Sequence, residues 1–404
     1  MVERKKYLDK VIPFIDKDII KVIVGFRRSG KSILLKLIQK YLKDNGRREE
    51  QFIYINFEDY QNVKYKDPDI LYPYILEQME NKREKNYVFF DEIQELKDFE
   101  KVINSLRVIE NVDVYITGSN SKLLSGELAT YLAGRYVSIN IFPFSFDEYI
   151  EGKKELGEDF LGREELFNHF IIEGGMPFIA AGDLDKQSKE TYLQDIYGSV
   201  VLRDIVERNN VRNVDLLDRI IKYIFANVGN IVSGSSLSKY FKSENRNINV
   251  ETILKYLGYC ADAFLIYPLR KNSLIGKEEL RVKEKYYVVD HGIRECLLHT
   301  NLRDIQLILE NIVAMEALSR GYNVTIGEVE KKEVDFVLEK GSVKIYLQVT
   351  YLLADEKTAD REFGSLLLIN DNYRKIVLSL DPILQPRDGI EHKKIYDFLL
   401  EKDW

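Results

Sequence analysis

Eight residues near the N-terminus have the types and the spacing of a phosphate-binding loop. Residues 25–32 read Gly-Phe-Arg-Arg-Ser-Gly-Lys-Ser, which fits the pattern GxxxxGK[ST]. In such a loop successive backbone N–H groups surround a polyphosphate, the lysine reaches the terminal phosphates, and the final hydroxyl holds Mg²⁺. We therefore expect a nucleotide to be bound by Gly25, Arg28, Ser29, Gly30, Lys31 and Ser32, with Ser32 also a metal ligand.

Two adjacent acids, Asp91 and Glu92, follow the apolar run at residues 87–90. A carboxylate at the carboxyl end of a buried strand can complete the shell of Mg²⁺, and a neighbouring one can orient and deprotonate a water molecule. We assign the first role to Asp91 and the second to Glu92. A surface pair that caps a helix beginning at residues 93–96 is the alternative reading.

Other candidates for contacts with the phosphates lie after the next apolar runs. Residues 117–120 read Thr-Gly-Ser-Asn after a run at 112–116, and Asn120 or Ser119 could contact the γ-phosphate or the attacking water, unless they only form a turn. Arg135, before a run at 137–141, is the preferred cationic group for sensing the γ-phosphate, and Arg203 is its rival.

These residues require an α/β fold that brings strand ends together. Apolar runs predict strands at residues 19–24, 52–57, 87–90, 112–116 and 137–141, and a helix follows the loop at residues 32–38. An extra strand between the loop strand and the acid strand is the arrangement of the additional-strand class of P-loop ATPases. The sequence therefore predicts an ATPase core over residues 1–145.

Helical periodicity dominates the middle of the chain. Helical spacing at residues 147–150, 163–173 and 186–208, broken at 174–177, predicts a helical lid over 146–210. Three helices at 213–229, 233–241 and 249–261 and two strands at 264–267 and 285–289 predict a winged helix over 211–300. Its third helix would expose Glu251, Thr252, Lys255 and Tyr256, with Lys271 and Lys277 on the wing. A DNA reader and a protein-contact or purely architectural module remain equal alternatives.

The last hundred residues resemble a nuclease scaffold. A helix at residues 305–320 with Glu310, a strand at 334–338 with Asp335 and a strand at 344–349 follow the order of the PD-(D/E)xK nuclease fold. In that fold an Asp and a second acid hold a metal, and a lysine two residues after the acid supports the attacking water. Here Gln348 and Thr350 occupy the positions of acid and lysine, so we expect residues 301–404 to be nuclease-like without nuclease activity.

Taken together, the loop, the Phe90-Asp91-Glu92 strand, Thr117-Gly118-Ser119, Gly134-Arg135, residues 142–145 and residues 174–177 resemble a large group of prokaryotic ATPases. That family has an AAA-type ATPase domain, a winged helix and a C-terminal nuclease-like domain of uncharacterised role. The resemblance implies ATP as the nucleotide, and the sequence has no Asn-Lys-x-Asp motif for reading guanine. It implies no substrate.

The composition of the chain argues against several other classes of protein. The chain has 404 residues, 45% of them hydrophobic, and a formal net charge of −7, which does not favour a protein that coats nucleic acid or an anionic membrane. Only Cys260 and Cys296 occur, and the four histidines are scattered, so neither a disulfide framework nor a zinc site is expected. No apolar run reaches the ~18 residues of a membrane span. We expect a cytoplasmic protein without a membrane partner.

These observations lead to a principal hypothesis and alternatives. The principal one is a Mg²⁺-dependent ATPase that acts as a nucleotide-controlled switch or motor on a partner, such as a protein, held by the C-terminal domains; a homo-oligomer is compatible with it. The second is an ATP-regulated regulator that binds duplex DNA through Lys255 and Lys271. The third is an ATP-coupled nuclease using Glu310 and Asp335. A small-molecule kinase is the least favoured, since Glu92 suits hydrolysis.

Overall fold

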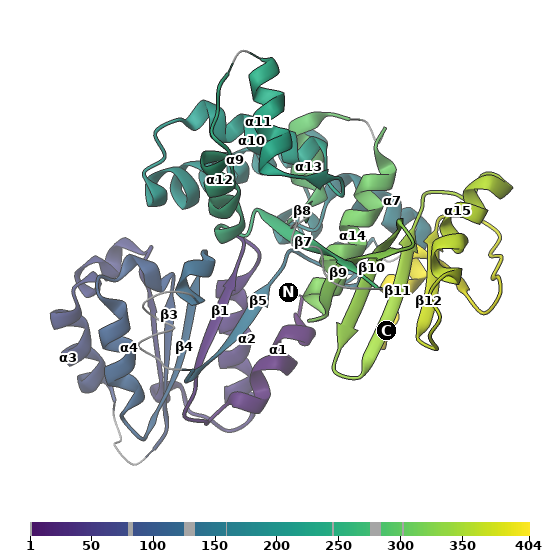
Figure 1. Cartoon of the computed structure of the whole chain (residues 1–404). Coiled ribbons are helices and arrows are strands. Elements are labelled where there is room, and N and C mark those ends of the chain that lie inside the picture. Colours follow the sequence, from purple (N-terminus) through teal and green to yellow (C-terminus); the bar gives the residue numbers. More distant parts are fainter. Residues whose placement is uncertain are drawn as a thin grey trace. The chain divides into compact units, whose positions relative to one another are not determined.

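The computed structural model describes residues 2–79, 84–124, 134–158, 160–244, 246–274, 284–300 and 303–404. The chain forms two compact units (Figure 1). The first contains residues 1–142 and 262–264, and the second contains residues 143–261 and 265–404. No helix among the described residues is long and apolar enough to cross a membrane.

The first unit is built on a parallel sheet. Within the described residues this sheet has five strands in the order β2-β3-β4-β1-β5, coloured purple to blue in Figure 1. Their bounds are β1 Ile20–Gly25, β2 Phe52–Asn56, β3 Asn86–Asp91, β4 Val112–Gly118 and β5 Tyr136–Ile141. Strand β4 lies between β1 and β3, so the sheet has the predicted extra strand between the loop strand and the acid strand.

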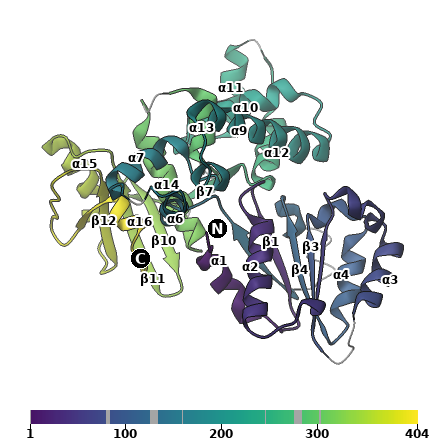
Figure 2. The ribbon, with the colours of Figure 1, turned by 180° about the vertical axis from the view of Figure 1, so that it is seen from behind.

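Helices cover the sheet of the first unit because its central strands are apolar on both faces. Every residue of β1, β3 and β4 is buried. The four helices described in this unit are α1 Lys5–Val11, α2 Lys31–Asp44, α3 Pro68–Gln78 and α4 Phe99–Arg107. Helices α1 and α2, adjacent in Figure 2, form one core with alternate residues of β1, β3, β4 and β5. Helix α4 packs against β4.

The second unit begins with helices. Their bounds are α6 Phe146–Glu155, α7 Arg163–Glu173, α8 Pro177–Ala180, α9 Lys186–Ser199, the π-helix η6 Val200–Glu207, α10 Val214–Ala226, α11 Gly234–Ser243, α12 Val250–Asp262 and α13 His291–Leu298. Polar side chains define several starts: Asn213 accepts the N–H of Leu216, and Ser233 accepts that of Ser236. The predicted helices at 163–173 and 186–208 and the three helices after 213 are therefore present.

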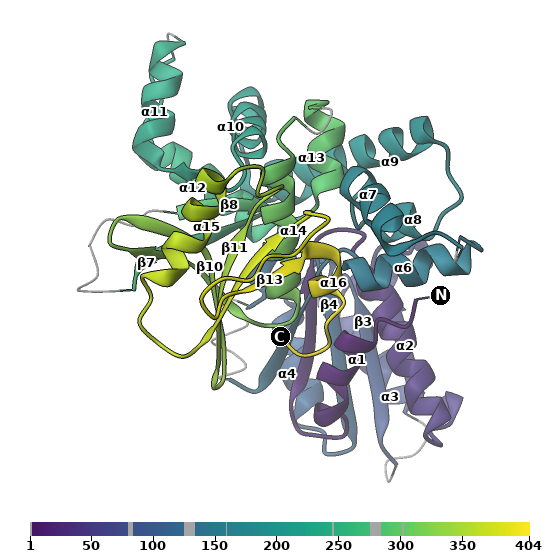
Figure 3. The ribbon, with the colours of Figure 1, turned by 90° about the vertical axis from the view of Figure 1, so that its right-hand side faces the viewer.

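A second sheet follows the helices, and the part described has the order β13-β12-β11-β10-β9-β7-β8-β6. The strand bounds are β6 Ile231–Val232, β7 Ile266–Ser273, β8 Glu284–Val288, β9 Asn323–Val329, β10 Lys332–Lys340, β11 Val343–Val349, β12 Arg374–Ser379 and β13 Glu391–Lys394. The remaining helices are α14 Ile305–Ser319, α15 Glu356–Leu367 and α16 Ile395–Leu399. Figure 3 shows α14 beside this sheet, and it contacts β8, β9, β10 and β11.

Strand β7 joins the two halves of this sheet. It pairs antiparallel with β8 on one side and parallel with β9 on the other, where Lys271 lies opposite Ile326. Strands from before and after residue 300 therefore belong to one continuous sheet. At this residue we predicted a boundary between a winged helix and a nuclease-like domain. Three helices and a strand hairpin are present in the first of these regions, but both assignments stay predictions.

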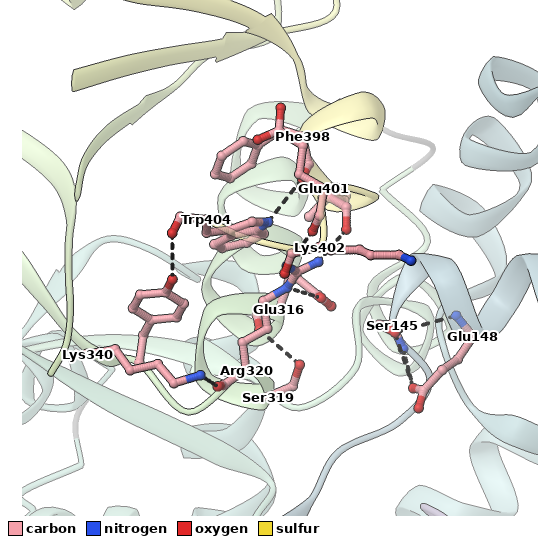
Figure 4. A network of polar contacts seen from close by, with 12 residues as sticks. Ser145, Glu148, Glu316, Ser319, Arg320, Lys340, Phe398, Glu401, Lys402 and Trp404 are labelled. Carbon is pink, nitrogen blue, oxygen red and sulfur yellow. Dashed lines mark hydrogen bonds and ion pairs between the residues drawn. The ribbon is translucent and has the colours of Figure 1, made fainter. Parts of the chain in front are cut away.

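The end of the chain is fastened by Arg320, just after α14 (Figure 4). Its guanidinium donates to the carbonyl oxygens of Leu399, at 2.6 Å, and of Glu401, at 2.6 Å, and lies 4.2 Å from the centre of the Trp404 ring. The indole N–H of Trp404 in turn donates to the carbonyl of Phe398 at 3.1 Å. These contacts hold the last residues against the C-terminal end of α14. Figure 4 also shows Ser145 and Glu148, which form the capping box that begins α6.

Candidate functional site

The phosphate-binding loop lies between β1 and α2, at the carboxyl edge of the first sheet. Gly25 is required by space, because a Cβ there would lie 2.1 Å from the carbonyl oxygen of Ile141. Gly30 has φ 104° and is the N-cap of α2, and Arg28 has φ 61°, a conformation that non-glycine residues rarely adopt. The loop therefore leads into the positive end of a helix, where backbone N–H groups favour an anion.

The lysine of the loop is buried and faces the acid pair. The ammonium of Lys31 donates to the carbonyl oxygens of Gly25 at 3.3 Å and Phe26 at 3.2 Å, and lies 3.6 Å from Oε1 of Glu92. Ser29 is fully buried, and its hydroxyl has no hydrogen-bond partner among the residues that the structure describes. Ser32 is half-buried in the first turn of α2. The structure therefore brings Lys31 and Glu92 together, as predicted from the two motifs.

Asp91 is fully buried at the end of β3, and both of its carboxylate oxygens accept hydrogen bonds. Oδ1 accepts from the hydroxyl of Thr117 at 2.5 Å, and Oδ2 accepts from the phenol of Tyr54 at 2.9 Å. Burial, followed by the charge of Asp91, raises the pKa of Tyr54, so its phenol remains a donor. Each oxygen still has a lone pair for a further interaction.

Thr117 connects the two acids. Besides donating to Asp91, its hydroxyl accepts the backbone N–H of Glu92 at 2.9 Å. Neither Thr117 nor Tyr54 was among the predicted site residues. The signal for Thr117 was its place at the end of β4, since the carboxyl ends of parallel strands meet at one edge, whereas nothing in the local sequence pointed to Tyr54.

Glu92 is held as a carboxylate in a strained backbone conformation. Its φ is 55°, and its Oε2 accepts from the amide of Gln94 at 2.5 Å. Burial alone would raise the pKa of Glu92, but the ammonium of Lys31, the Gln94 amide and the charge of Arg27 outweigh it, so the pKa is lowered. The alternative of a helix cap is not supported, because Glu92 precedes the short helix η4 Ile93–Glu95 without a capping bond from its side chain.

Asn120 and Ser119 are buried just after β4, at the same edge of the sheet. Gly118, the last residue of β4, allows close packing before them, because a Cβ there would lie 1.8 Å from a methyl carbon of Leu123 and 2.9 Å from Oε1 of Gln94. A role for Asn120 at the γ-phosphate is compatible with this position and stays a prediction.

The role predicted for Arg135 is wrong for a nucleotide bound by its own chain. In the parallel register Ile20 lies opposite Tyr136 and Gly25 lies opposite Ile141, and the carbonyl of Arg135 accepts the N–H of Ile20 at 3.1 Å. Arg135 is therefore at the amino edge of the sheet, six residues or about 20 Å from the start of the loop, which is farther than its side chain extends. The rival, Arg203, is exposed on η6 in the second unit, and its role stays a prediction.

The first unit fits a magnesium nucleotide. The loop can start this close to the end of β5 only because Gly25 has no side chain, and it presents a lysine, a hydroxyl and a helix N-terminus. Asp91 supplies a hard carboxylate oxygen of the kind that Mg²⁺ prefers, and Glu92 lies beside it. These groups come from β1, α2 and β3 and meet at one edge of the sheet.

The nuclease-like candidates in the second unit do not fit a metal. Asp335 accepts the N–H of Val349 at 2.8 Å, and its own N–H donates at 2.7 Å to the amide oxygen of Gln348. The amide nitrogen of Gln348 donates to Glu362 at 2.9 Å. Over the described parts of the chain no group of three or more His, Cys, Asp or Glu side chains could hold a metal ion.

A lysine supplies the positive charge in this region instead. Lys285 on β8 is buried, and its ammonium lies 2.5 Å from Glu333. Burial raises the pKa of Glu310 to about 7, although Lys285 opposes the change. Burial also raises the pKa of Asp335, and the neighbouring Glu310 charge adds to it. The buried ammonium of Lys285 among these carboxyls opposes the binding of a second cation such as Mg²⁺.

The residues predicted to contact DNA do not form a basic face. The ammonium of Lys271 lies 2.7 Å from Glu328 and 3.0 Å from Glu333, so the expectation of an exposed wing lysine is wrong. Lys255 is exposed on α12, but Tyr256, expected to be exposed, is buried, and the exposed Glu251 offsets the charge of Lys255. Lys277 lies outside the described residues. DNA binding gains no support from this geometry.

Comparison with known proteins agrees with the site in the first unit. Residues 17–150 match a family model described as an AAA domain, and residues 164–304 match a model described as a domain of unknown function. The first match contains the phosphate-binding loop, both acids and Thr117. A solved structure described as a Walker-type ATPase of Pyrococcus abyssi aligns with 73% of this chain and 95% of its own, at 15% identity and a TM-score of 0.48.

Relatives extend over most of the chain. An uncharacterized protein of Haemophilus influenzae is 39% identical over 402 residues, which is 99% of both chains. An uncharacterized protein of Methanocaldococcus jannaschii is 35% identical over 355 residues, which is 85% of this chain and 77% of that protein. The two units therefore occur together in proteins from a bacterium and from an archaeon.

Proposed function

Because this chain belongs to the family of the uncharacterized Haemophilus influenzae protein and carries an AAA domain in residues 17–150, we propose that it is a Mg²⁺-dependent ATPase. The observation that supports this most strongly is the convergence of Lys31, Glu92 and Asp91 at one sheet edge. The loop would hold the phosphates, with Lys31 at their terminal end. Ser32 and Asp91 would hold the magnesium.

Glu92 is the proposed general base. Its carboxylate is buried and its pKa is lowered, so it is ionised at neutral pH and able to accept a proton from water. In the structure its partner is the ammonium of Lys31. The incoming phosphates are a stronger attraction for this ammonium, so we expect nucleotide binding to release Glu92 for its role.

Substitutions of the two residues separate binding from hydrolysis. We expect the purified protein to hydrolyse ATP with Mg²⁺, Lys31→Ala to lose nucleotide affinity, and Glu92→Gln to bind ATP while turnover falls by about 10²–10⁴-fold. Lys36→Ala is the matched control, because Lys36 is exposed on the same helix. Nucleotide affinity is measured by equilibrium binding and turnover by release of phosphate. Unchanged affinity and turnover in Lys31→Ala would remove the assignment.

We further propose that the second unit binds the partner on which the ATPase acts as a switch or motor. A cavity of about 480 Å³ in this unit supports a role in binding. It lies among α7, α9 and α13. Its lining includes Leu193 and Cys296, two lysines, Lys186 and Lys189, and three glutamates, Glu173, Glu190 and Glu295. Glu92→Gln should accumulate the ATP-bound form, so a pulldown with it should retain a partner that Lys31→Ala does not. Equal recovery with both variants would argue against nucleotide control.

A further inference from the structure

A buried arginine outside the recognised motifs contacts the phosphate-binding loop. Arg4 precedes α1 and is only 2% exposed. Its Nη1 donates to the carbonyl oxygen of Ser29 at 2.9 Å, and its Nη2 donates to the carbonyl oxygen of Phe142 at 2.7 Å. One guanidinium therefore ties the loop to the residue that follows β5.

We propose that Arg4 is a positioning residue that keeps the Ser29–Gly30 peptide group oriented for binding phosphate. This inference rests on the proposed function of the loop. The carbonyl of Ser29 and the N–H of Gly30 belong to the same planar trans peptide and point in opposite directions. By holding the carbonyl oxygen, Arg4 also fixes the direction of the Gly30 N–H.

The Gly30 N–H is one that an anion would use. Gly30 is the N-cap of α2, and the N–H groups at the start of a helix have no acceptor within the helix. A Cβ placed on Gly30 would lie 3.4 Å from Nη1 of Arg4, so the arginine is packed directly against this part of the loop. If the peptide turned over, the carbonyl oxygen of Ser29 would face the phosphate in place of a donor.

The loop needs such a restraint because its backbone is strained. Arg28, just before Ser29, has φ 61°, a conformation that a non-glycine residue tends to leave, and Gly30, just after it, has φ 104° and as a glycine can adopt several others. A planar guanidinium can hold two carbonyl oxygens in fixed directions at once. The compact ammonium of a lysine has no such fork and is less able to satisfy both.

A purely structural role in docking α1 is the competing explanation, and Tyr7 provides the control for it. Tyr7 is fully buried on α1, its phenol oxygen accepts the N–H of Phe142 at 3.2 Å, and the Arg4 guanidinium lies 4.7 Å from its ring centre. Tyr7→Phe weakens the docking of α1 and leaves the two hydrogen bonds of Arg4 intact. It should therefore change stability without changing nucleotide affinity.

The test measures binding of a nonhydrolysable ATP analogue and thermal unfolding of the nucleotide-free protein. We expect the dissociation constant to rise about 10-fold in Arg4→Lys, the value of one charge-assisted hydrogen bond. Tyr7→Phe should bind like the wild type even where its unfolding temperature falls further. Wild-type affinity in Arg4→Lys, or an equal loss of affinity in Tyr7→Phe, overturns the inference. If the wild type binds no analogue, the proposed function itself fails.

Discussion

Replacing Thr117 by valine tests whether one hydroxyl holds the two acids of the site. The hydroxyl is fully buried, donates to Asp91 and accepts the N–H of Glu92. Valine has nearly the same shape, so the change removes two hydrogen bonds without opening a cavity. A hydrogen bond to a charged group contributes about 1.5–3 kcal/mol and one between neutral groups about 1 kcal/mol. The expected loss of unfolding free energy is therefore about 2–4 kcal/mol.

The assay follows from the size of the first unit. For a domain of about 150 residues each kcal/mol moves the unfolding temperature by about 3 °C, so the first unit should unfold about 6–12 °C lower in Thr117→Val. Circular dichroism measures this change. Turnover of ATP should also fall by about 10–100-fold, because Asp91 and Glu92 lose their common support.

Thr117→Ser is the matched control, since it keeps the hydroxyl and loses a methyl group. We expect its unfolding free energy to stay within about 1.5 kcal/mol of the wild type and its turnover to remain. A valine variant as stable and as active as the serine variant would refute the reasoning that this hydroxyl holds the acids.

Two further predictions concern one buried acid and one glycine. Burial raises the pKa of Glu310 from 4.5 to about 7, so the folded form keeps a proton that the unfolded form releases, and the stability gained below pH 4.5 is lost as pH rises to 7. Glu310→Gln should remove this dependence and be more stable at pH 8 by up to about 3 kcal/mol, measured by urea unfolding with Trp404 fluorescence; an unchanged pH slope would contradict it. Gly25→Ala should destabilise the first unit by at least about 1–3 kcal/mol and abolish nucleotide binding, because the added Cβ meets the carbonyl of Ile141. Gly198→Ala is the control, since there is open space around Gly198, and it should not lower the unfolding free energy. A Gly25→Ala protein that binds ATP normally would count against the assigned geometry.

Local patterns were sufficient for the first unit's framework. Runs of apolar residues located all five strands described there. Every residue of β1, β3 and β4 is buried, so only a few polar residues interrupt their runs. The spacing of Gly25, Gly30 and Lys31 identified the loop, because its geometry depends on residues close in sequence. The extra strand also followed from the order of the runs, and the structure has it at β4.

Contacts between distant residues were not accessible in the same way. Tyr54 reaches Asp91 from 37 positions away, and Arg4 reaches Ser29 from 25 positions away, so no local motif contains either pair. The error over Arg135 has a related cause. Its distance from the loop depends on the direction and register in which β5 pairs with β1. The neighbours of Arg135 in the sequence do not determine either of them.

The second unit was harder to read. Strands β6 and β13 have only two and four residues, which is too short for a periodic pattern. The sequence identified the hairpin that contains Lys271, but not the second strand that pairs with β7. Strand β7 also pairs with β9, and that pairing places Glu328 and Glu333 beside the lysine. An exposed position was predicted because only one of the two neighbouring strands could be inferred.

The shared strand β7 has a mechanical consequence. A hinge near residue 300 would have to break the parallel hydrogen bonds between residues 271–273 and 326–328, so the segments before and after it can turn only as one piece. The described strands from β6 at one edge to β13 at the other would then move together as one sheet. Dividing the gene at this point would separate β7 from β9 and leave each as an unpaired edge strand. The two fragments should therefore aggregate.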